Sequence, residues 1–227
     1  NQLNTGLIEA FVEIGFGIYR LCPGLRALVP FDTRAPIDPF QLNLFAVRPE
    51  RARVLEARGF LADAPASEAP GASDAQVAAW VKARPLLAAL DQARALEITR
   101  PLRHLVRAED PSLGAAERLA ELLAADREAE AWLRAEPSPE ARLTAARAAL
   151  AAGRRARARD IMANAAWRET TTPVRLFACP LPEYERLGVY QNPQVLGTVA
   201  EFFRIGGRSA RMERRLGLLV AKLRAGV

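Results

Sequence analysis

The side chains best suited to bind a ligand are cationic ones near the C-terminal end of the sequence. A Gly-Gly turn at 206–207 precedes a Ser that can cap a helix, and basic residues then recur at spacings that place them on one helix face. These residues are Arg208, Ser209, Arg211, Arg215 and Lys222. Free N–H groups at a helix N-terminus and converging guanidinium groups favour an anion about the size of a phosphate. The alternative is a plain Gly C-cap that runs into an ordinary amphipathic helix.

A second basic region covers residues 138 to 168, where seven Arg accompany only two acidic residues. We assign Arg154, Arg155 and Arg159 to the same anion- or nucleic-acid-binding surface. Such a surface suits a phosphate backbone, an acidic protein or an anionic membrane. However, 30 of the 32 basic residues are Arg and Ala is frequent, a bias that a GC-rich coding sequence produces by itself. The pI of 10.1 is therefore a weak sign of nucleic-acid binding.

Recognisable catalytic signatures are missing from the sequence. We find no nucleophile elbow, P-loop, zinc-protease helix motif, dinucleotide-binding glycine motif or paired-cysteine motif. His104 is the only imidazole, so this chain alone cannot build a His-dependent triad or a multi-His metal site. His104 stands between Arg103 and Arg107, and we expect it to be a plain surface or half-buried side chain. We therefore expect no enzyme activity, no cofactor and no metal.

Two pairs of carboxylates stand four residues apart on a predicted helix. They are Glu117 with Glu121, and Asp126 with Glu130. Metal-binding helical bundles combine such carboxylates with Glu-x-x-His motifs on other helices, and this sequence has none. We expect instead a solvated helix face on which Arg118 and Arg127 balance the acidic charge.

The composition is that of an ordinary globular protein. Of the 227 residues 50% are hydrophobic and 26% are charged, which excludes a wholly disordered chain or a collagen-like repeat. No apolar run is long enough to cross a membrane and no signal-peptide pattern is present, so we expect a soluble protein. Cys22 and Cys179 are too few for a disulfide framework, which favours a cytoplasmic location.

Hydrophobic residues recur mainly with helical period, which predicts a mainly α fold: a multi-helix body with helical hairpins, with room for one short strand or small hairpin near 173–178. Residues 4 to 22 are expected to form one helix behind Asn4, although alternation over 12–18 also fits a strand. A short helix is expected after Pro39 and another over 49–59, with Val54 and Leu55 inward. Further helices should begin at the capping box of Ser73 and after Thr99, and a long one should cover 113–135. Residues 139–152 and 154–166 should form a helical hairpin that turns at Gly153. Four aromatic residues should be largely buried, namely Trp80, Trp132, Phe202 and Phe203.

Residues 62–75 contain two prolines and no apolar side chain larger than Ala, so we expect them to contribute nothing to a core. They predict a flexible Ala/Pro linker between an N-terminal helical segment, 1–61, and a helical body, 76–227. Within that body, 76–168 should form helical hairpins and 169–227 a C-terminal basic helical part. Limited proteolysis should cut the linker before other segments.

Helical hairpins without catalytic signatures are typical of proteins that present binding surfaces. The sequence therefore favours a non-catalytic α-helical binding or assembly subunit, whose partners are other protein subunits. The alternative is a nucleic-acid-binding protein that contacts DNA or RNA backbone phosphates without reading sequence.

Overall fold

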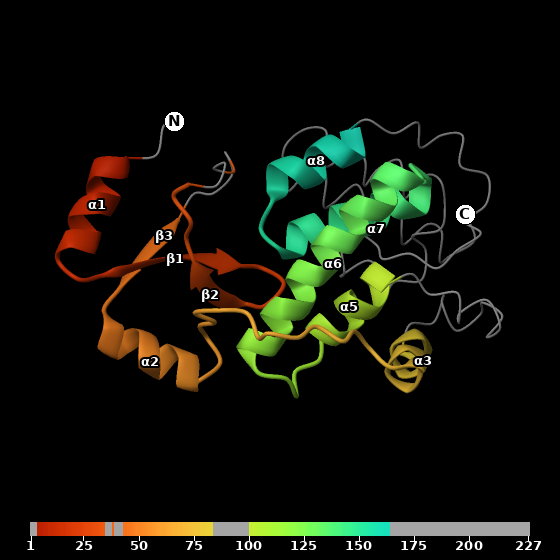
Figure 1. Ribbon diagram of the computed structural model, residues 1–227, viewed down its shortest axis with the longest axis horizontal. Helices are drawn as coiled ribbons and strands as arrows, with labels where there is room; N and C mark the ends of the chain where they lie inside the picture. Colours follow the sequence, from red (N-terminus) through yellow and green to blue (C-terminus); the bar gives the residue numbers. More distant parts are fainter. Residues whose placement is uncertain (1–3, 35–37, 39–42, 84–99, 164–227) are drawn as a thin grey trace, which may run out of the picture.

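The computed structural model describes residues 4–34, 38, 43–83 and 100–163. This part of the chain contains seven helices and one small antiparallel sheet, arranged as two neighbouring lobes (Figure 1). The predicted mainly α fold is confirmed. The strand expected near 173–178 and the helices expected C-terminal to it lie outside the described residues, as do Phe202 and Phe203.

The N-terminal lobe, residues 4–61, combines two helices with the sheet. Its elements are α1 (Thr5–Glu13), β1 (Gly17–Cys22), β2 (Ala27–Pro30), β3 (Leu44–Val47) and α2 (Pro49–Ala57). The expectation of one helix over 4–22, and of a helical segment over 1–61, is wrong. Gly15 adopts a φ of 87°, a conformation that glycine tolerates and a helix does not, so the helix ends at Glu13 and β1 begins at Gly17.

The strand order is β2-β1-β3, and both pairings are antiparallel. Tyr19 in the central strand lies opposite Pro30 on one side and Phe45 on the other. Tyr19 and Val47 form a small core with Leu61, against which α2 packs Leu55. Val54, which was also expected to point inward, is exposed.

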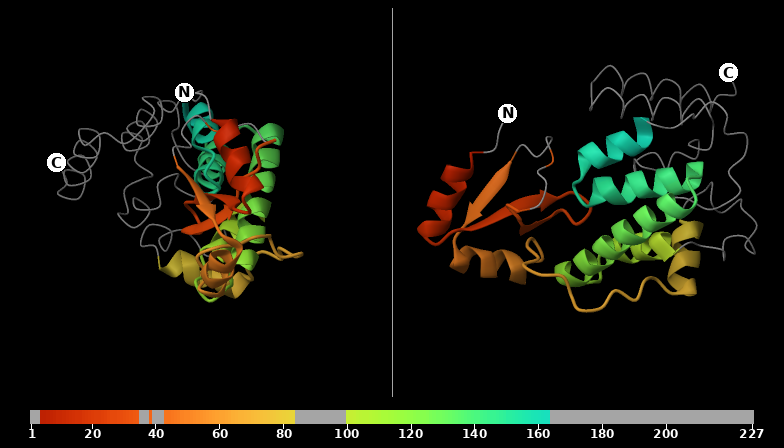
Figure 2. Two further views of the ribbon diagram at one scale, coloured as in Figure 1. Left: turned by 90° about the vertical axis from the view of Figure 1, so that its left-hand side faces the viewer. Right: turned by 45° about the horizontal axis from the view of Figure 1, so that its top comes forward.

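The helical body comprises α3 (Asp74–Lys82), α5 (Arg100–Ala108), α6 (Ala115–Ala135), α7 (Pro139–Ala151) and α8 (Arg155–Ala163). The capping box at Ser73 and the hairpin of α7 and α8 are confirmed, and Gly153 turns that hairpin with a φ of 85°. Figure 2 shows α5 to α8 stacked side by side. Small side chains make this stacking close, because α7 buries five alanines almost completely: Ala141, Ala145, Ala146, Ala148 and Ala149.

The two described tryptophans are less buried than expected. Trp80 and Trp132 pack against the main core but are only half-buried. Each indole N–H points to a carboxylate at the surface, with Trp80 donating to Glu109 at 3.2 Å and Trp132 to Glu136 at 3.4 Å. Because each indole N–H keeps its hydrogen bond to a carboxylate near the surface, part of the indole ring stays outside the core.

Residues 62–75 cross from the N-terminal lobe to α3 along the helical body. The expectation that they contribute nothing to a core is wrong, because Ala62 is 1% exposed and Ala72 4% exposed within the main core. The Ala66 N–H donates to the Ala116 carbonyl at 3.0 Å. Small side chains let the backbone approach closely, so backbone hydrogen bonds hold a segment that has little to bury. The division into domains and the early proteolytic cut stay predictions.

The β1–β2 turn holds the N-terminal lobe against the α7–α8 hairpin. The Gly24 N–H donates to the Ala151 carbonyl at 2.8 Å, and Arg20 Nη1 donates to the Ala152 carbonyl at 2.9 Å. At the start of α8, the Ala156 N–H donates to Asp38 Oδ2 at 2.9 Å. The lobe thus satisfies backbone groups at the end of α7 and the start of α8 that have no partner within their own helices.

Candidate functional site

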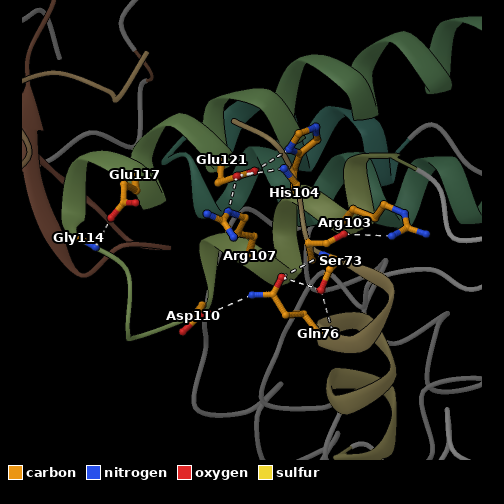
Figure 3. Close-up of polar contacts among 11 residues, drawn as sticks. Ser73, Gln76, Arg103, His104, Arg107, Asp110, Gly114, Glu117 and Glu121 are labelled. Carbon is orange, nitrogen blue, oxygen red and sulfur yellow. Dashed lines mark hydrogen bonds and ion pairs between the residues drawn. The ribbon is translucent and has the colours of Figure 1, made fainter. Parts of the chain in front are cut away.

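A buried polar cluster centres on Glu121 of α6, whose side chain is 1% exposed (Figure 3). Glu121 Oε2 lies 2.6 Å from His104 Nδ1, and its Oε1 lies 2.8 Å from Arg107 Nε in an ion pair. The Gly71 N–H donates to Oε1 at 3.1 Å. One carboxylate therefore joins two side chains of α5 to the crossing segment 62–75.

The sequence positions these groups simply. His104 and Arg107 stand three residues apart on α5, so both project toward the same stretch of α6. The expectation of a surface or half-buried histidine is wrong, because His104 is 6% exposed. The solvated face expected around Glu121 is also wrong. An apolar helix pair can bury this carboxylate because hydrogen-bond contacts with Gly71 and His104 and the ion pair with Arg107 replace its water.

The Glu121 cluster has the contacts of a structural anchor. A carboxylate beside an imidazole can orient a general base, but such a base needs its second ring nitrogen to reach a substrate. The His104 side chain is only 8% exposed, and a Cβ at Gly71 would lie 3.5 Å from its Cε1, so little of the ring is open to a substrate. No group of three His, Cys, Asp or Glu side chains among the described residues could hold a metal ion.

Contacts beside the Glu121 cluster attach the start of α3 to α5. Arg103 Nη1 donates to the Ala72 carbonyl at 3.0 Å, and its Nη2 forms an ion pair with Asp74 at 2.6 Å. The reciprocal hydrogen bonds of the Ser73–Gln76 capping box lie directly next to these contacts (Figure 3). The polar side chains in this region thus hold backbone segments together.

A second charged cluster joins α6 to the start of α8. Asp126 forms an ion pair with Arg154, and Glu130 accepts two hydrogen bonds from Arg157 at 2.7 and 2.8 Å. Arg154 also lies 3.6 Å from Glu130. The expectation that Arg118 and Arg127 balance these carboxylates is therefore wrong, since the partners come from the next hairpin.

The pKa values of the two carboxylates in this cluster move in opposite directions. Burial raises the pKa of Asp126, and it outweighs the opposing effect of Arg154. The hydrogen bond from Arg157 lowers the pKa of Glu130 and outweighs the smaller effect of burial. The surroundings of Glu130 thus favour its ionised form, whereas those of Asp126 disfavour ionisation.

The predicted anion-binding arginines lie at the start of α8. Arg154 contacts Asp126 and Glu130, Arg159 contacts Asp160 at 3.0 Å, and Arg155 is exposed in the first turn. The other predicted site residues lie outside the described residues: Arg208, Ser209, Arg211, Arg215 and Lys222. Convergence of Arg208, Ser209, Arg211 and Arg215 on one anion stays a prediction.

An exposed apolar surface of the N-terminal lobe was missed by the sequence reasoning. Seven large apolar side chains are exposed in the described part of the chain, and every one lies between positions 7 and 60. They are Leu7, Val12, Ile14, Leu21, Phe45, Val54 and Phe60. Large exposed apolar groups that cluster in one part of a protein usually mark an interface.

Helix α1 is the clearest part of this surface. Of its nine residues only Ile8 is buried, and Phe11 makes an edge-to-face contact with Phe16 at 5.5 Å. Ile14, which ends the helix, is 70% exposed. The sequence contained a sign of this exposure. Viewed down the helix axis, the apolar side chains from Ala10 to Val12 cover a wider arc of the circumference than one packing contact can bury.

Comparison with family models, curated proteins and solved structures finds no match for this chain. Among the helices of the described residues, none combines the length and the apolar character that a membrane span requires.

Proposed function

We propose that the protein is a non-catalytic binding subunit of a larger assembly, and that it contacts another protein subunit through the exposed apolar surface of its N-terminal lobe. One observation carries this proposal: all seven exposed large apolar side chains of the described residues belong to that lobe. We place the protein in the cytoplasm, in keeping with its few cysteines.

The charged groups of the helical body support the same proposal. Arg147, Arg154 and Arg157 form ion pairs with carboxylates of α6 or of the turn between α5 and α6. Cations that already face carboxylates release few counterions when a phosphate approaches, so they add little to nucleic-acid affinity. Backbone binding to DNA or RNA remains the alternative, and it depends on the C-terminal basic residues named above.

Site-specific photo-cross-linking tests the proposal. A benzophenone amino acid replaces Ile14 in the full chain, which is expressed in the cells that produce it. We expect one discrete protein adduct, and we expect Leu7→Gln in the same chain to reduce it. The matched control places the probe at Arg134, an exposed position of α6, where no adduct should form.

Equal cross-linking at both positions, or none at position 14, would contradict the proposal. The nucleic-acid alternative makes a separate prediction. If it holds, the chain binds duplex DNA or RNA with an affinity that falls log-linearly with salt, and the double change Arg211→Gln with Arg215→Gln flattens that slope by roughly one to two.

A further inference from the structure

We infer that α1 docks an amphipathic helix of a partner protein whose apolar stripe is bordered by Lys or Arg. This inference rests on the proposed function and names the chemistry of the partner. It follows from three properties of α1: its weak attachment to the lobe, the line of exposed apolar side chains along it, and the sign of the charges beside that line.

The attachment of α1 is weak for a helix of its composition. A nine-residue helix is marginal in water unless tertiary packing supports it. Here support comes from buried Ile8, from the Phe11–Phe16 ring contact and from the Asn4 side chain, which accepts from the Leu7 N–H at 3.1 Å. A second apolar surface laid along α1 would bury the side chains that the lobe leaves in water.

The exposed apolar side chains of α1 form a line. Leu7, Ala10 and Ile14 stand at i, i+3 and i+7, a spacing that puts them on one helix face, and all three are exposed. This face is turned away from the direction of Ile8. The same spacing is what an apolar helix needs to pack lengthwise against another helix.

The charge along the edge of this face selects the partner. Glu9 and Glu13, one turn apart and both exposed, border the Ala10 side of the line, and α1 has no basic residue. No ion pair of the described residues involves either carboxylate. A partner helix with Lys or Arg beside its apolar stripe would neutralise them.

The same charges disfavour two other occupants. When two copies of α1 pack antiparallel about a two-fold axis, like edges meet, so the edge that carries Glu9 and Glu13 would face the same acidic edge of the other copy. Helices that lie on anionic membranes carry Lys or Arg on their polar face, whereas α1 carries Glu. A basic amphipathic helix is the occupant that matches both the apolar line and its acidic edge.

Two designed peptides test the inference on the full chain by fluorescence anisotropy. Both carry the same Leu/Ala stripe in an 18-residue helix, and they differ only in having Arg or Glu along its edges. We expect the Arg peptide to bind about fivefold to tenfold more tightly than the Glu peptide. Equal binding of the two peptides, or no binding of either, would overturn the inference.

Variants assign the binding to α1. Leu7→Gln with Ile14→Gln should weaken the Arg peptide roughly tenfold, while Ala131→Gln, at an exposed position of α6 outside the apolar surface, should have no effect. Glu9→Gln with Glu13→Gln should remove the preference for Arg and leave the apolar contribution. Unchanged affinity in the first double variant, or an unchanged preference in the second, would exclude α1 as the site.

Two further measurements separate the competing occupants. If α1 bound a second copy of the chain, sedimentation velocity would show self-association that Ile14→Gln abolishes, and we expect none. We also expect that vesicles of phosphatidylserine and phosphatidylcholine do not bind the chain through α1. Either opposite result would overturn the inference. If the cross-link at position 14 persists in the Glu9→Gln, Glu13→Gln chain at full yield, the proposed function stands and only the basic partner is wrong.

Discussion

The N-terminal lobe and the helical body treat their apolar and charged side chains differently. The helical body buries Leu102, Leu122 and Leu143 and pairs its buried charges internally, as in the Glu121 cluster. The N-terminal lobe leaves large apolar side chains in water, with Ile14 as the most exposed of them. One region buries its large apolar side chains, and the other exposes the surface that we propose for association.

The arginines of the two regions show the same contrast. In the helical body, Arg154 and Arg157 contact carboxylates of a neighbouring helix. In the N-terminal lobe, Arg48 and Arg58 lie over aromatic rings, 5.3 Å from the centre of Phe16 and 5.2 Å from that of Phe60. Both guanidinium groups and the Phe60 ring are exposed, whereas the Phe16 ring is half-buried.

The largest effect is expected at Glu121. Glu121→Gln keeps the size of the side chain but removes a buried charge, so the half-buried Arg107 guanidinium loses its counter-charge. We expect the free energy of unfolding to fall by about 3 to 5 kcal/mol, measured by urea denaturation.

Glu117→Gln is the matched control for this change. Glu117 stands one turn earlier on α6, is exposed, and accepts from the Gly114 N–H at 2.9 Å, a contact that the Gln oxygen can keep. We expect its effect to stay within about 0.5 kcal/mol. Similar losses in both variants would show that the helical body does not depend on its buried charge.

The next effect concerns the junction of the two regions. A Cβ at Gly24 would lie 2.7 Å from the Ala151 Cβ and 3.0 Å from its carbonyl oxygen, so Gly24→Ala must push the β1–β2 turn away from α7. We expect a loss of about 1 to 3 kcal/mol in thermal or urea unfolding. Gly6→Ala in α1, which meets no atom closer than 3.6 Å, should instead stabilise slightly.

The helices of the body could be predicted from the sequence, because local signals agree with the packing there. Ser73 with Gln76, Ser138 with Pro139, and the turn at Gly153 bound helices that the structure contains. The polar clusters could not be predicted in the same way. Arg154 and Asp126 are 28 residues apart, and only the fold of the α7–α8 hairpin brings them together.

The errors in the N-terminal lobe have a different cause. Over 12–18 the residues fit a helix and a strand equally well by period, but the structure divides them: α1 ends at Glu13, and β1 begins at Gly17 and pairs with β2 and β3. In 62–75 the side chains gave no sign of burial, because the backbone makes the contacts. The exposure of Ile14 depends on which parts of the chain pack against α1, and the helical period of its apolar residues carries no information about that packing.

A smaller effect is expected from pH. The pKa of Glu130 is lower in the folded protein than its ordinary value, so its contribution to stability is complete above the unfolded pKa of about 4.3 and is lost as the pH falls through the folded pKa. Arg157→Gln removes the main cause of this shift. We expect it to cost about 1 kcal/mol or less at pH 7, and to leave stability less sensitive to acid below pH 4.3, measured by urea denaturation across pH. An unchanged acid limb would contradict this assignment.

The smallest effect on stability should come from the surface that we assign to binding. Ile14→Gln replaces a side chain that is 70% exposed, so the free energy of unfolding should change by less than about 0.5 kcal/mol. Ile8→Gln on the buried side of the same helix should cost clearly more, because it places a polar group where α1 meets the lobe. Urea denaturation of both variants makes the comparison within one helix. A large loss for Ile14→Gln would mean that this residue already supports the fold, and α1 would then resemble the helices of the body. A small loss, together with a weaker cross-link, would separate the surface that binds from the residues that fold.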